Sequence, residues 1–93
     1  MSSRSLNEYP GGEIVEKGLE DLAHGIHSEE ALLLLAAGPR LRVLGLEIRD
    51  PGGIERPFEH RLFELLEERL DRGAHSAYNA LIGRLVSFAD TYP

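Results

Sequence analysis

The chain has no cysteine and no tryptophan, and Lys17 is its single lysine. Without cysteine it can form neither a disulfide framework nor a thiolate zinc site, although secreted domains of this size often depend on such cross-links. Residues 1–10 lack the positive start and the apolar run of a secretory signal, and no stretch approaches the roughly 18 apolar residues of a membrane span. We therefore expect a cytoplasmic protein that does not enter a membrane.

Clustered basic charge is also missing. The sequence carries 16 acidic and 10 basic residues, which gives a formal net charge of −6. Half of the basic residues fall in the segment 39–61, where acidic residues are interspersed with them. Binding to nucleic acid or to an anionic membrane requires several cations close together. Neither kind of partner is expected.

What the sequence does contain is helical periodicity. Its 93 residues suffice for one domain, and 42% of them are hydrophobic. Apolar side chains recur at the spacing of amphipathic helices in four segments, 13–24, 28–37, 57–72 and 76–92. A short helix is expected at 39–44, followed by an extended segment near 44–48. The prediction is an all-α fold, a small bundle of four main helices plus one short helix. It forms a single domain over 13–93, after a flexible N-terminal arm at 1–12.

Start and stop signals support these segments. Ser28 precedes two glutamates, so its hydroxyl can cap the second helix while the carboxylates interact favourably with the helix dipole. Ser76 is expected to cap the last helix in the same way. Gly38 and Gly73 are expected to end the second and the fourth helix.

The second helix contains four consecutive leucines, Leu32, Leu33, Leu34 and Leu35. Adjacent helical positions point about 100° apart, so these side chains surround almost the whole helix. If the bundle covers about three of them, the fourth faces a partner, and a twofold homodimer is the commonest way to cover such a surface. The alternative is a central helix that other helices cover on every side.

A histidine and carboxylate pattern gives one alternative function. Asp21 and His24 lie three residues apart on one helix face, and His27 follows in the next loop. Helical bundles hold metals with carboxylate and histidine pairs of this kind, but they repeat the pattern on a second helix. Here the repeat is absent from the sequence, and the three residues can equally be capping or surface groups. Metal binding is therefore the alternative, and no cofactor is expected.

The segment 69–78 gives a second alternative. Arg69, His75 and Tyr78 resemble the Arg, His and Tyr pattern of the HEPN-type ribonucleases, small helical toxins in which Arg and His flank a scissile phosphate. Five residues separate Arg69 from His75, as the family allows. Tyr78 follows His75 by three places instead of two, a rotation of about 100° on a helix. The resemblance implies a ribonuclease that uses Arg69 and His75.

The polar residues otherwise have simpler structural roles, and neither a serine nucleophile elbow nor a phosphate-binding loop occurs in the sequence. We therefore expect a small acidic helical protein that acts as a protein-interaction or regulatory module and is not an enzyme. We expect it to associate with itself or with another protein.

Overall fold

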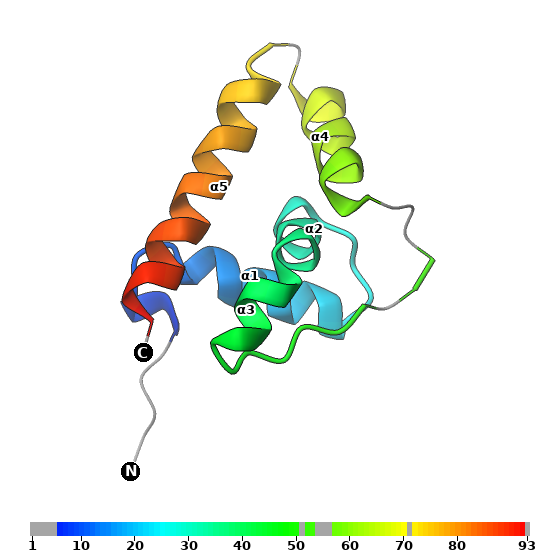
Figure 1. Cartoon of the computed structure of the whole chain (residues 1–93). Coiled ribbons are helices and arrows are strands. Elements are labelled where there is room, and N and C mark those ends of the chain that lie inside the picture. The colour runs from blue at the N-terminus through cyan, green and yellow to red at the C-terminus, as the bar shows by residue number, and fades with distance from the viewer. Residues whose placement is uncertain (1–5, 51, 54–56, 71, 93) are drawn as a thin grey trace.

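Helices account for all regular structure in the part of the chain that the structure describes (Figure 1). The computed structural model describes residues 6–50, 52–53, 57–70 and 72–92. In chain order its elements are the 3-10 helix η1 (Leu6–Glu8) and the α-helices α1 (Gly12–Ala23), α2 (Glu29–Ala36), α3 (Gly38–Val43), α4 (Phe58–Arg69) and α5 (Ala74–Thr91). The predicted all-α class and its five helices are confirmed.

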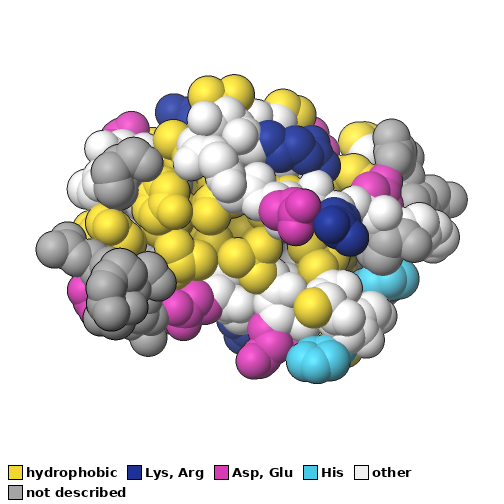
Figure 2. All heavy atoms as spheres, turned by 90° about the horizontal axis from the view of Figure 1, so that it is seen from below, with side chains coloured by type: hydrophobic (Ala, Val, Ile, Leu, Met, Phe, Trp, Pro, Cys, Tyr) yellow, Lys and Arg dark blue, Asp and Glu magenta, His cyan; other side chains and the backbone are white. Residues whose placement is uncertain are grey.

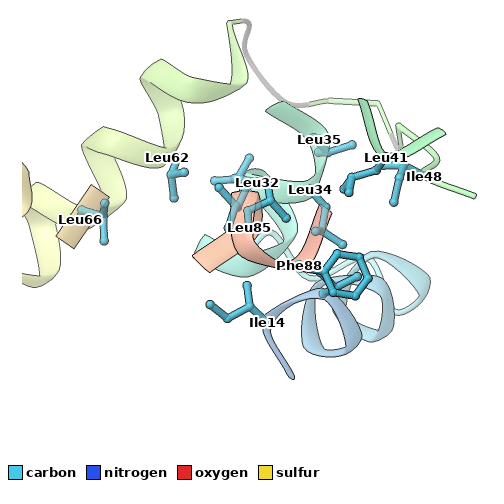
Figure 3. Close-up of a cluster of buried hydrophobic side chains, with 12 residues drawn as sticks. Ile14, Leu32, Leu34, Leu35, Leu41, Ile48, Leu62, Leu66, Leu85 and Phe88 are labelled. Carbon is cyan, nitrogen blue, oxygen red and sulfur yellow. The ribbon is translucent and has the colours of Figure 1, made fainter. Parts of the chain in front are cut away.

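Helix α2 packs against both α1 and α4 and forms the centre of the core. Leu32, Leu33 and Leu34 have no exposed surface, and Leu35 is 4% exposed. Side chains from α1, α3, α4 and α5 surround these leucines (Figure 3). The expectation that one leucine faces a partner is therefore wrong, and the alternative of a central helix is correct. The periodicity could not decide between them, because a helix that is apolar on every side suits both.

The contact between α1 and α2 is close because one residue at it has no side chain. A Cβ atom added to Gly18 would lie 2.6 Å from Cδ1 of Leu34 and 2.8 Å from the carbonyl oxygen of Glu30. Any side chain at position 18 would therefore push the two helices apart. Glycine lowers the helix propensity of α1 but allows this contact.

The turn between α1 and α2 is held by a predicted cap. Ser28 Oγ accepts a hydrogen bond from the backbone N–H of Ala31 at 3.1 Å, as expected for the N-cap of α2. The same hydroxyl donates to Asp21 Oδ2 at 2.5 Å, and the Lys17 ammonium donates to that oxygen at 2.8 Å. The end of α1 and the start of α2 are thus joined through one carboxylate.

The turn between α4 and α5 differs from its prediction. Helix α4 ends at Arg69, because Leu70 adopts an extended conformation. Position 71 lies outside the described residues. Helix α5 begins at Ala74, and its N-cap is Gly73, which has a positive φ of 86° and lies three residues before the expected cap. The prediction that Ser76 caps this helix is wrong, since Ser76 lies within its first turn.

Part of the expected flexible arm packs on the domain. The ring of Tyr9 lies edge-on to Phe88 and Tyr92 at the end of α5, with centroid distances of 6.0 and 5.3 Å. Gly11 has a positive φ of 73°, and a Cβ atom there would clash with the carbonyl group of Arg84. Residues 6–12 therefore belong to the packed unit, and residues 1–5 lie outside the described ranges.

The segment after α3 forms no strand. A turn at Leu44 and Gly45 leads into irregular chain through residue 48. The Arg42 guanidinium donates two hydrogen bonds, at 3.0 and 2.7 Å, to the carbonyl oxygen of Ile48, whose side chain is buried. The expected alternation is present, since Ile48 faces the core and Glu47 faces water, but no second strand lies beside it among the described residues.

Candidate functional site

The structure does not bring the three candidate metal ligands together. Asp21 is 6% exposed, and its carboxylate is engaged by Lys17 and Ser28. These two hydrogen bonds hold the pKa of Asp21 below its ordinary value, and the one from Lys17 has the larger effect. His24 and His27 are exposed. Among the described residues, no group of three histidine, aspartate or glutamate side chains is arranged to hold a metal ion.

The residues of the ribonuclease alternative have other partners. Arg69 donates from Nε and Nη2 to the two carboxylate oxygens of Glu29 on α2, at 2.6 and 3.0 Å, and this pairing raises the pKa of Arg69. The rings of His75 and Tyr78 contact Phe63 on α4, with centroid distances of 5.1 and 5.9 Å. The cation that would hold a phosphate is thus bound to a carboxylate, while the histidine ring packs on a phenylalanine.

The hollow beside Arg69 is also unsuited to a phosphate. It has a volume of about 750 Å³, and its lining includes Glu29, Glu30 and Glu68. These carboxylates outnumber its one arginine, so the local charge opposes an anionic substrate. The structure therefore offers no geometric support for cleavage of nucleic acid at this place.

An apolar groove between α3 and α5 is the clearest candidate for a functional surface. Its volume is about 330 Å³, within the range that begins at roughly 300 Å³ for ligand sites. We call it the α3–α5 groove. Its lining consists of Ala36, Ala37, Pro39, Arg40, Leu41, Ile82, Leu85, Val86 and Ala89. Among these described residues Arg40 alone is charged.

The shape of the groove follows from helix spacing and from small side chains. Ile82, Val86 and Ala89 repeat at four and three residues, so they form one stripe along α5. Ala36 and Ala37 lie where α2 passes into α3, and their short side chains leave the space between the two walls empty. The arrangement can accept the apolar side chains of another molecule.

Two exposed aliphatic side chains belong to the helices that form the walls of this groove, and one of them, Val86, lines it. Val43 is 85% exposed, and it follows Pro39 and Arg40 by four and three residues on α3. Val86 of the α5 wall is 36% exposed. Figure 2 shows hydrophobic side chains gathered over the face of the molecule seen from below. Surface valines scattered singly need no explanation, whereas Val86 adds exposed aliphatic surface to an apolar groove.

A second hollow adjoins the groove. It has a volume of about 580 Å³ and is lined partly by Leu35, Arg42 and Phe58. Ala36 and Pro39 line both hollows, so the start of α3 forms a ridge between them. This part of the surface therefore has relief, with a raised segment flanked by two depressions.

The predicted contact residues do not line the α3–α5 groove. Leu32–Leu35 were the predicted contact residues, but the groove lies where α2 passes into α3 and continues along α5. A weak signal was present in the two alanines before Pro39, which are too small to fill the space between helices. Ala89 lies more than fifty positions from them in the sequence, and helical spacing does not place such distant residues together.

A comparison with known protein families, with curated proteins and with solved structures finds no match to this chain. In the described residues no helix is long and apolar enough to cross a membrane. The residues of this chain are therefore the sole basis for a proposal about its function.

Proposed function

We propose that this chain is a protein-interaction module whose docking surface is the α3–α5 groove. The observation that supports it is the lining of the groove, eight apolar residues and one arginine. Such a surface provides neither a nucleophile nor an acid–base pair, and it fits aliphatic side chains far better than a polar substrate. Binding, rather than catalysis, is the chemistry that these residues support.

The energetic reason for docking is the aliphatic surface left in water. Fully burying a valine or leucine side chain contributes about 1.5 to 3 kcal/mol relative to leaving it exposed. Val43 and Val86 keep much of this free energy available for a partner. Because the short side chains of Ala36 and Ala37 leave space between the walls of the groove, a partner side chain can enter the groove without displacing part of the core.

The test uses isobutanol, which has the shape of a leucine side chain, as a probe in methyl NMR titrations of the full chain. We expect saturable shifts of the Ile82 and Val86 methyl resonances, because these groups line the groove. The methyl groups of Ile26 should not shift, although Ile26 is 50% exposed, because no groove-lining residue belongs to the loop that follows α1.

A matched pair of variants on α5 completes the test. Ala89→Leu places a larger side chain in the groove and should abolish the isobutanol shifts. Ala80→Leu adds the same atoms at an exposed position that does not line the groove, and it should leave the shifts unchanged. Equal shifts at Ile26 and at the groove, or shifts that survive Ala89→Leu, would show that the groove is not a binding surface.

A further inference from the structure

We infer that the α3–α5 groove is occupied by a second copy of this chain, related to the first by a twofold axis. This inference rests on the proposed function, since it names the partner of the same surface. Three properties of the surface support it, namely its relief, the absence of carboxylates from its lining, and the charges at its two sides.

The relief of the surface is self-complementary. A twofold interface uses the same patch on both copies, so a patch that has only a depression cannot pair with itself. Here Pro39 belongs to a raised segment, and Val43 continues that segment by one helical turn. The groove lies directly beside it. The raised segment of each copy can therefore enter the groove of the other.

Charge favours this face for contact between two identical acidic chains. Each copy carries a net charge of −6, so most of the surfaces that two copies could bring together place carboxylates opposite one another. None of the residues that line the groove is acidic. Helix α5 carries a single acidic residue, Asp90, and its one arginine, Arg84, is already paired with Glu13. Two copies can approach through this face with little repulsion.

Opposite charges lie at the two sides of the groove, with Arg40 in its lining and Asp90 just beyond it on α5. Arg40 lines the α3 wall, and Asp90 follows Val86 of the α5 wall by one helical turn. Within the described part of the chain neither residue forms an ion pair. A twofold axis that places the α3 wall of one copy against the α5 wall of the other brings Arg40 to Asp90 twice. The same surface thus supplies both members of the pair.

The length of α5 is consistent with a modest interface. Its 18 residues span about 27 Å at about 1.5 Å per residue. Together with the six residues of α3, this stripe offers an elongated surface, and we expect the association to be reversible.

The experiment is sedimentation equilibrium of the full chain between about 1 and 500 μM, with circular dichroism recorded on every variant. We expect the wild type to be a reversible dimer. Arg40→Asp and Asp90→Arg should each weaken dimerisation by about tenfold, because each replaces two attractive pairs by two repulsive ones. The double variant, in which the two charges are exchanged, should restore wild-type dimerisation to within about threefold, because it restores both pairs.

A wild-type monomer at 500 μM overturns the inference, and so does a double variant that dimerises no better than the two single variants. If a charge-reversed variant loses helicity, the neutral variants Arg40→Gln and Asp90→Asn are used instead. Each should weaken dimerisation by about threefold. Failure of this inference differs from failure of the proposed function. A monomeric chain whose groove still binds isobutanol is an interaction module for another partner, whereas a monomeric chain whose groove binds no isobutanol has no docking surface there.

Discussion

Small residues lie both at the α1–α2 contact, which we call the closed contact, and along the α3–α5 groove, which we call the open contact, but the space beside them is filled differently. At the first, Gly18 brings the two helices so close that Leu34 fills the space between them. At the second, alanines occupy the positions where large side chains would be needed, and a groove of about 330 Å³ remains. Small residues close a contact when a large side chain lies opposite them, and they leave a groove when none does.

The two contacts also differ in how their polar groups are used. Beside the first, Asp21, Lys17 and Ser28 are joined by short hydrogen bonds within the chain. Beside the second, Arg40 and Asp90 have no ion-pair partner in the described residues. Substitutions of the polar groups at the first contact should therefore change stability, and substitutions of Arg40 or Asp90 at the second should change association while hardly affecting stability.

The largest effect is expected where the closed contact loses volume. Leu34→Ala should lower the free energy of unfolding by about 2 to 5 kcal/mol, because Leu34 has no exposed surface and its removal leaves a cavity. Urea unfolding followed by circular dichroism measures the change. A loss below about 1 kcal/mol would mean that α1 and α2 collapse onto the cavity and are not rigidly packed.

The next effect comes from adding one carbon atom to that contact. Gly18→Ala should lower the free energy of unfolding by about 1 to 2 kcal/mol, since the clash with Leu34 and Glu30 outweighs the gain in helix propensity. Gly83→Ala is the matched control, because a Cβ atom there meets nothing within 4 Å. It should raise the free energy of unfolding by about 0.5 to 1 kcal/mol. If both variants change the free energy of unfolding in the same direction, the helices are not as close at Gly18 as the structure indicates.

A smaller effect should depend on pH. The pKa of Asp21 is lower in the folded chain than its ordinary value of 3.8, because Lys17 and Ser28 donate to the carboxylate. The ionised Asp21 carboxylate therefore contributes to the free energy of unfolding above about pH 4. This contribution disappears as the pH falls through the lower pKa of the folded state. Asp21→Asn should cost about 1 kcal/mol at pH 7. The difference from wild type should shrink below pH 4, as urea titrations between pH 2.5 and pH 7 can establish. A difference that stays constant with pH would assign the effect to packing alone.

The smallest effect on stability is expected at the open contact. Val43→Ala should change the free energy of unfolding by less than about 0.5 kcal/mol, because the side chain is 85% exposed in the single chain. Chemical denaturation at a concentration below that of dimerisation gives this value. A loss above about 1 kcal/mol would mean that Val43 is already packed within the monomer, and the contrast between the two contacts would then disappear.

The sequence predicted those parts of the fold that depend on neighbouring residues. Ser28 was recognised as a cap because the residues that it serves follow within three positions. Ser76 was assigned the same role wrongly, because the competing signal of Gly73 is a backbone conformation and not a side-chain pattern. The α3–α5 groove was missed because its two walls are distant in the sequence. Local patterns identify helices and caps, but only the packed chain shows which gaps between helices stay open.

The aromatic contact between the two ends of the described chain constrains folding during synthesis. Helices α1 and α2 are neighbours in sequence, so their contact can form as soon as residue 36 has left the ribosome. Tyr9 must wait for Phe88 and Tyr92, which are made about eighty residues later. Until then the part of α1 that α5 contacts stays open to solvent, and chaperones or neighbouring nascent chains can reach it. Completion of α5 is therefore the step that closes the domain and forms the α3–α5 groove at the same time.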